Sequence, residues 1–194
     1  VVLDNVSFAI KKGEQATLTG RTGAGKSTIF KLLLGLYEPQ SGSVLINATP
    51  ARMIDDSQKR RLFGYVEQSF HMVPGTVKDQ ITLFDESISD EQVKAAATLT
   101  GLHDKIMKLE KGYDTICTPW LFSQGQRQLL SIARATAAQP ELLLLDEITA
   151  NLDAETEKTV LQALKRVSKD RTVLSISHRT MAETGRIIPI QSNK

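Results

Sequence analysis

The 194-residue chain has a single cysteine, Cys117, and almost no net charge. One thiol cannot form an intrachain disulfide or a cysteine-rich zinc site, so the fold needs neither and fits a reducing compartment. Lys and Arg total 24 against 22 Asp and Glu, a net charge of +2. Because so small a charge gives no electrostatic footprint for a polyanion, we expect no nucleic-acid partner.

The sequence also lacks a long apolar run, an internal repeat and a low-complexity segment. A membrane-spanning helix needs roughly 20 apolar residues, and the longest runs here, residues 32–34 and 142–145, are short core segments. The start, Val1-Val2-Leu3-Asp4, has no initiator Met, basic stretch or signal-peptide core. We therefore expect a soluble domain from the inside of a longer protein.

Apolar spacing and turn residues predict an α/β fold. Strands are predicted over residues 1–10, 15–19, 44–46, 63–66, 142–145 and 172–177. Helical spacing predicts helices over residues 28–36, 93–99 and 154–167, and another that opens at Ser123. Ser89 with Gln92, and Ser123 with Gln126, have the spacing of capping boxes. Strand signals fade between residues 76 and 138, which predicts a helical subdomain inserted into the α/β core.

Residues 20–27 read Gly-Arg-Thr-Gly-Ala-Gly-Lys-Ser, between a predicted strand and a predicted helix. In such a loop, backbone N–H groups and the following helix N-terminus surround phosphate oxygens. Lys26 adds a positive charge at the β and γ phosphates, and the Ser27 hydroxyl is placed to ligate Mg²⁺. A chance glycine-rich turn is the alternative, but the strand-loop-helix setting favours nucleotide binding. The expected contacts are Gly20, Arg21, Thr22, Gly23, Ala24, Gly25, Lys26, Ser27 and Thr28.

A second element of a phosphate site is the apolar run 142–145, which ends in Asp146 and Glu147. In open α/β sheets, ligands bind at the carboxyl ends of the strands. We expect Asp146 to hold Mg²⁺, directly or through water, and Glu147 to orient and deprotonate the attacking water. The alternative interpretation is two acids in a surface turn.

Residues 122–126, Phe-Ser-Gln-Gly-Gln, resemble the Leu-Ser-Gly-Gly-Gln signature of the ABC ATPases and depart from it at the leucine and the first glycine. The resemblance implies a P-loop NTPase with a RecA-like core that hydrolyses ATP with Mg²⁺. It also implies that Ser123, Gly125 and Gln126 face ATP held by a second ABC domain, packed head to tail. A helix N-terminus suits that role, and Ser123 can act as a helix cap at the same time.

Further matches to this family follow in order along the chain. Gln68 resembles the Q-loop glutamine, which contacts Mg²⁺ and the water and links the site to the helical subdomain. Asp153 ends a segment like the D-loop that crosses to the other subunit, or else it caps the next helix. His178 resembles the switch histidine, which contacts the γ-phosphate and helps hold Glu147 and the water. By themselves, Gln68 would be a surface residue and His178 a structural one.

The resemblance covers the whole chain and implies one ABC ATPase domain, residues 1–194, truncated at both ends. A RecA-like core is expected over residues 1–70 and 139–194, and a helical subdomain over about 71–138. Residues 75–81 and 112–115 resemble exporter segments that lie near transmembrane domains. Residues 116–121 are shorter than the matching exporter segment and lack its acidic and glycine residues, which puts communication with those domains in doubt.

The leading hypothesis is the ATP-binding and ATP-hydrolysing domain of an ABC exporter at the cytoplasmic face of the cell membrane. It would dimerise around ATP and drive attached transmembrane domains. A soluble ABC ATPase of DNA repair, chromosome structure or translation is the second hypothesis, although the chain lacks the coiled-coil insertions and basic linkers of such proteins. A P-loop kinase is the third and leaves residues 123–128 unexplained. Homodimer and heterodimer both stay open.

Overall fold

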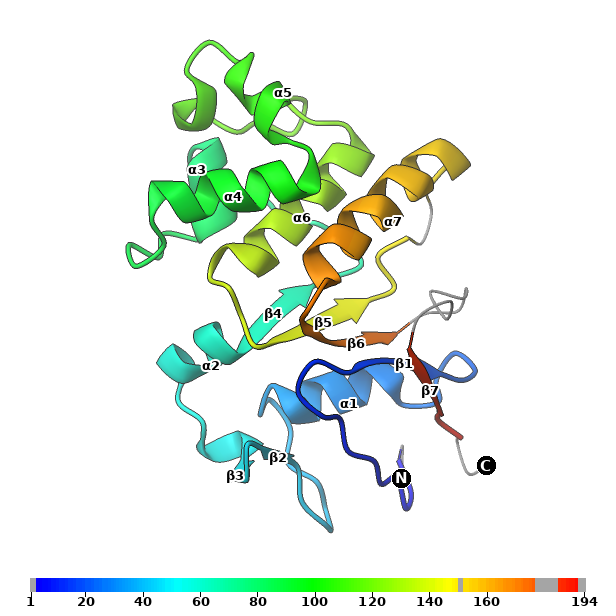
Figure 1. Ribbon diagram of the computed structural model, residues 1–194. Helices are drawn as coiled ribbons and strands as arrows, with labels where there is room; N and C mark the ends of the chain where they lie inside the picture. Colours follow the sequence, from blue (N-terminus) through cyan, green and yellow to red (C-terminus); the bar gives the residue numbers. More distant parts are fainter. Residues whose placement is uncertain (1–2, 150–151, 177–184, 192–194) are drawn as a thin grey trace.

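The computed structural model describes residues 3–149, 152–176 and 185–191 of the chain. Strands and helices are combined in an α/β core, and residues 77–137, between β4 and β5, form a succession of helices (Figure 1). The strands are β1 (Gln15–Thr19), β2 (Leu45–Ile46), β3 (Thr49–Pro50), β4 (Phe63–Val66), β5 (Leu142–Asp146), β6 (Thr172–Ile176) and β7 (Arg186–Pro189). The α-helices are α1 (Lys26–Leu33), α2 (Asp56–Leu62), α3 (Val77–Thr82), α4 (Asp90–Thr100), α5 (His103–Met107), α6 (Gln124–Ala137) and α7 (Ala154–Ser168). Two 3₁₀ turns are η1 (Ala51–Met53) and η2 (Gly112–Asp114).

The main sheet has five strands in the order β4-β5-β6-β1-β7, and neighbouring strands pair in parallel. A separate antiparallel pair, β2 and β3, lies beside α1 and α2 (Figure 1). Since the strands of the main sheet point the same way, the carboxyl ends of β1, β4, β5 and β6 meet at one edge. Open α/β sheets bind their ligands at this edge.

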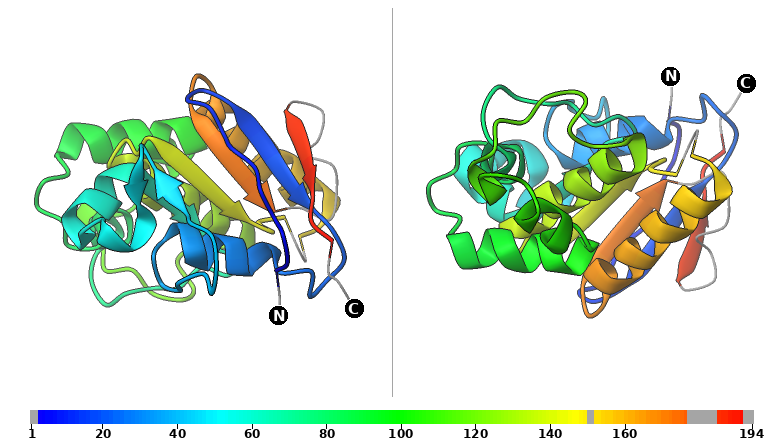
Figure 2. Two further views of the ribbon diagram at one scale, coloured as in Figure 1. Left: turned by 90° about the horizontal axis from the view of Figure 1, so that it is seen from below. Right: turned by 90° about the horizontal axis from the view of Figure 1, so that it is seen from above.

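Helices cover both faces of the main sheet. Figure 2 shows α1 on one face, and α6 and α7 on the other. The leucines of β5 point alternately to the two faces of the sheet. Leu144 packs in the core beneath α1, whereas Leu143 and Leu145 pack in the core beneath α6 and α7. A parallel strand that is buried on both faces has a continuous apolar sequence for this reason.

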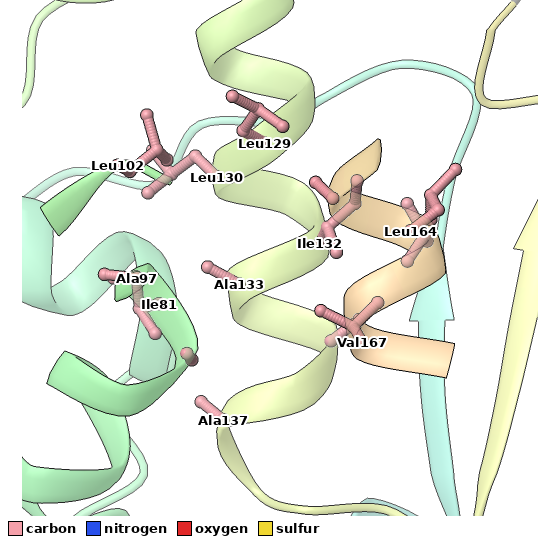
Figure 3. Close-up of a cluster of buried hydrophobic side chains, with 14 of the residues drawn as sticks. Ile81, Ala97, Leu102, Leu129, Leu130, Ile132, Ala133, Ala137, Leu164 and Val167 are labelled. Atoms are coloured by element: carbon pink, nitrogen blue, oxygen red, sulfur yellow. The ribbon is translucent and has the colours of Figure 1, made fainter. Parts of the chain in front are cut away.

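The helices α3 and α4 form a further layer packed on α6. Figure 3 shows Ala133 and Ala137 of α6 facing Ile81 of α3 and Ala97 of α4, while Ile132 faces Leu164 of α7. One continuous core cluster joins this layer to β4 and β5. The predicted helical content of this region is therefore confirmed, and the subdomain boundary near residues 71 and 138 stays a prediction.

Most elements expected from the sequence are confirmed within a few residues, among them β1, β4, β5, β6, α1, α4, α6 and α7. The expected capping boxes at Ser89 and Ser123 are both formed. Within the described ranges, no helix has the length and apolar content that crossing a bilayer requires.

The structure differs from the sequence prediction at both ends of the chain. Residues 3–10, the described part of a predicted strand, form no strand. Their apolar side chains Phe8 and Ile10 pack partly buried against the core on the α1 face, which explains the alternating pattern without a sheet partner. Strand β7 was not predicted, because it depends on pairing with β1, at the opposite end of the chain.

Candidate functional site

The loop between β1 and α1 is shaped by glycines in backbone conformations that other residues rarely adopt. Gly20 has φ 150° and Gly25, which precedes α1, has φ 95°. A Cβ at Gly20 would lie 2.4 Å from the carbonyl oxygen of Ile190, so this position has no space for a side chain. No side chain caps the start of α1, which leaves its first N–H groups free of such a partner and suited to an anion.

Lys26 is the first residue of α1 and is only 5% exposed. Its Nζ donates to the carbonyl oxygens of Gly20, at 2.8 Å, and Arg21, at 3.1 Å. A buried ammonium group needs such partners, and these two hold it over the loop that it follows. The next residue, Ser27, is exposed. The loop residues 20–28 thus form the strand-loop-helix unit that the sequence predicts.

Asp146 ends β5 on the sheet face that carries α1. Its Oδ2 accepts a hydrogen bond from the Tyr65 hydroxyl at 3.1 Å. Burial raises the pKa of Asp146, whereas the hydrogen bond from Tyr65 and the charge of Lys26 act in the opposite direction. Burial also raises the pKa of Tyr65, so the phenol keeps its proton. The strand order β5-β6-β1 places the end of β5 and the loop that follows β1 at the same edge of the sheet, separated by β6.

Glu147 leaves the strand in an unusual backbone conformation. Its φ is 47°, in the left-handed region, and its N–H donates to the carbonyl oxygen of Ile176 at 3.1 Å. A non-glycine residue held there costs on the order of 1 kcal/mol or more, and such residues gather at functional sites. The chain therefore leaves the extended conformation of β5 directly after Asp146, which the sequence alone did not indicate.

Gln68 follows β4, the strand beside β5, and is exposed. The segment around it is fastened to the helices: the Gln128 amide of α6 donates to the Glu67 carbonyl oxygen at 3.2 Å. Farther along, Arg134 donates to the His71 carbonyl oxygen at 2.9 Å and its guanidinium lies 4.4 Å from the centre of the Phe70 ring. The segment that contains Gln68 is therefore hydrogen-bonded to α6 and continuous with strand β4.

The predicted signature segment forms the start of α6. The Ser123 N–H donates to Gln126 Oε1 at 3.0 Å, and the Gln126 N–H donates to Ser123 Oγ at 3.3 Å. Gly125 is buried, and a Cβ there would lie 2.3 Å from Thr156 Cγ2 at the start of α7. Among the described residues, no hydrogen bond or ion pair joins residues 123–126 to the loop of residues 20–28.

Asp153 is the cap of α7, as the alternative interpretation holds. Its Oδ1 accepts from the N–H groups of Glu155, at 3.1 Å, and Thr156, at 3.0 Å, and the hydrogen bonds with Thr156 lower the pKa of Asp153. The capping roles of Ser123 and Asp153 are thus confirmed, and their contacts with a nucleotide stay predictions. His178 and residues 150–151 of the expected D-loop lie outside the described residues.

The acidic side chains of the described ranges do not form a metal site alone, because they include no group of three or more His, Cys, Asp or Glu that could hold an ion. Mg²⁺ in proteins commonly takes one or two carboxylates together with substrate phosphates and water. Asp146 and the Ser27 hydroxyl fit that mode, in which the nucleotide supplies the remaining oxygens.

Comparison with protein families matches residues 3–150 to a family described as ABC transporter. The chain is 38% identical over 196 residues to the uncharacterized ABC transporter ATP-binding protein YfiC of Bacillus subtilis, an alignment that covers 99% of the chain and 32% of that protein. It is 39% identical over 198 residues to the alpha-hemolysin translocation ATP-binding protein HlyB of Escherichia coli, covering 100% of the chain and 28% of that protein.

A solved structure, that of a bacterial Atm1-family ABC exporter with ATP bound, has the same fold. The TM-score is 0.84 at 33% sequence identity, and the match covers 98% of this chain and 34% of the exporter chain. The chain thus spans about a third of the length of the proteins that it matches.

The contact of Gly125 with Thr156 predicts a coupled pair of substitutions. Gly125→Ala should lower the free energy of unfolding by about 1–3 kcal/mol, the usual cost of forcing an extra carbon into a packed site. In the Thr156→Ser background the obstructing methyl group is absent, so most of that loss should disappear. Denaturant unfolding of the four proteins measures the coupling, and an equal loss in both backgrounds would contradict it.

Proposed function

The chain belongs to the ABC transporter family, and on that premise we propose that it binds and hydrolyses ATP to drive an exporter-type transporter. The observation that carries the proposal is the meeting, at one sheet edge, of the loop that follows β1 and holds Lys26 with Asp146 and Glu147 at the end of β5. Similarity to an exporter with ATP bound and to a toxin-translocation protein favours export over the soluble ABC ATPases of DNA repair, chromosome structure or translation.

Residues 20–28 would bind the phosphates of ATP. Lys26 Nζ exchanges its carbonyl partners, Gly20 and Arg21, for phosphate oxygens, and the start of α1 presents further N–H donors. Ser27 and Asp146 would hold Mg²⁺, with Gln68 at the same edge. When bound, Mg²⁺ neutralises charge on the β and γ phosphates.

Glu147 is the proposed general base. Its backbone leaves the extended conformation of β5, with φ 47°, and we assign the two carboxylates different tasks: Asp146 would serve the metal and Glu147 the attacking water. His178 and Gln68 would help to position that water. Without a carboxylate in this place, the water keeps its proton and attack on the γ-phosphate is slow.

The site would be completed by a second ABC ATPase domain packed head to tail, either another copy or a different subunit. Ser123, Gly125 and Gln126 lie at the start of a helix on the opposite face of the sheet from α1, where the exposed Ser123 would face the nucleotide of a partner. Asp153, at the start of α7, would lie in the same interface. The assembly would attach to transmembrane domains at the cytoplasmic face of the membrane.

Replacement of the base tests the catalytic assignment. Glu147→Gln in the assembled transporter should lower the rate of ATP hydrolysis by about 10²–10⁴-fold, the usual contribution of a general base, while ATP binding persists. Glu141→Gln is the matched control, because Glu141 is exposed just before the other end of β5. Normal hydrolysis by the Glu147→Gln protein would rule out this residue as the base.

The head-to-tail arrangement predicts that Ser123 acts on the partner's nucleotide. Ser123→Arg should leave ATP binding by the separated domain within about twofold of normal, yet lower hydrolysis in the assembled transporter by about 10-fold or more. Ser89→Arg, which removes the equivalent cap from α4, controls for the loss of a capping box. If Ser123→Arg weakened ATP binding by the separated domain as much as Lys26→Ala does, the arrangement would be wrong.

A further inference from the structure

We propose that Tyr65 is a positioning residue, whose hydroxyl fixes the orientation of the Asp146 carboxylate so that its other oxygen faces Mg²⁺. The inference rests on the proposed function, in which Asp146 serves the metal. Its direct basis is the hydrogen bond of 3.1 Å from the Tyr65 hydroxyl to Asp146 Oδ2. No family motif pointed to Tyr65, which precedes Gln68 by three residues in the sequence.

The register of the sheet explains why this tyrosine reaches this aspartate. Tyr65 of β4 is paired with Leu144 of β5. Side chains two residues apart in a strand lie on the same face, about 7 Å apart, so Asp146 follows Leu144 on the face where Tyr65 lies. A tyrosine is long enough to span that offset, whereas an aliphatic residue in its place would end beside Leu144.

Packing holds the Tyr65 ring in this direction. Phe30 of α1 meets it edge to face, with ring centroids 6.0 Å apart and an interplanar angle of 82°. Phe30 is 1% exposed and lies one turn beyond Lys26 in the same helix. Tyr65 therefore touches both halves of the site, since its ring contacts the helix that begins with Lys26 and its hydroxyl binds the carboxylate of β5.

A hydrogen bond to one carboxylate oxygen limits how the group can rotate. With Oδ2 engaged by Tyr65, Oδ1 is the oxygen that remains for the metal or a water on it. Partners of this kind orient metal ligands, and their removal typically costs 10–100-fold in metal affinity. A purely structural tyrosine would instead affect stability and leave the metal untouched.

Tyr65→Phe in the full-length protein tests the proposal, because it removes the hydroxyl and keeps the ring on Phe30. With protein in excess over a non-hydrolysable ATP analogue, Mn²⁺ is titrated and free Mn²⁺ is read from its EPR signal. We expect half-saturation at an Mn²⁺ concentration about 10-fold higher than for the unsubstituted protein. Analogue binding in EDTA and the thermal unfolding midpoint, which report folding, should change little.

Tyr113→Phe is the matched control, because the Tyr113 hydroxyl also has a side-chain partner, His103 Nδ1 at 2.8 Å, in the helical layer. It should bind Mn²⁺ normally. Asp146→Asn should weaken Mn²⁺ binding at least as much as Tyr65→Phe, and the double variant should add nothing further.

Each outcome separates the two proposals. If Asp146→Asn weakens Mn²⁺ binding and Tyr65→Phe does not, the role of Tyr65 is overturned and the proposed function stands. If Asp146→Asn binds Mn²⁺ normally, the proposed metal role of Asp146 fails. If the Tyr65→Phe protein is unstable, the double-variant comparison in the Asp146→Asn background decides: an equal further loss of Mn²⁺ affinity there overturns the proposal.

Discussion

The parallel pairing of β5 with its neighbours is the constraint on which the rest of this molecule depends. Its register sets Asp146 beside Ile176 of β6 and Leu144 beside Tyr65 of β4. A shift of one residue would turn Asp146 to the opposite face, away from α1 and Lys26. The four leucines alone do not fully specify the register, because a strand shifted by one residue would still place leucines on both faces of the sheet. The one polar residue of the strand, with its partner Tyr65, therefore helps to specify the register.

The helical layer is bound to the site through α6. The same helix carries Ser123 at its start, Gln128 against the Glu67 carbonyl, and Arg134 against His71. Gln80 of α3, which is fully buried, adds hydrogen bonds to both backbone groups of Val73. These contacts join the segment that follows β4 to the helices, so a displacement of α6 would move the signature segment and the region of Gln68 together.

Features determined by a few neighbouring residues could be predicted from the sequence. The loop at Lys26, the caps at Ser89 and Ser123, and the buried run before Asp146 each depend on local spacing. The resemblance to a known family assigned the loop and Asp146 to one ATP site and Ser123 to the ATP of a second domain, and these assignments stay predictions. The roles of Gln68, Ser123 and Asp153 toward a nucleotide remain predictions, because they depend on contacts with ATP and with a second domain.

Features that depend on distant pairing could not be predicted. The contact of Tyr65 with Asp146 spans 81 positions and requires the strand order, which no local pattern supplies. Strand β7 likewise depends on its pairing with β1. The left-handed backbone at Glu147 could not be predicted either, because the usual signal for a positive φ, a glycine, is absent. The surrounding sheet holds a glutamate in a conformation that it rarely adopts.

A crystal structure of the Glu147→Gln protein with ATP and Mg²⁺ tests the central claim most directly. We expect the β and γ phosphates within the loop of residues 20–28, at hydrogen-bond distance from Lys26 Nζ, with Mg²⁺ between Ser27 Oγ and the Asp146 carboxylate. ATP bound elsewhere, with Lys26 still donating to the carbonyl oxygens of Gly20 and Arg21, would contradict the account.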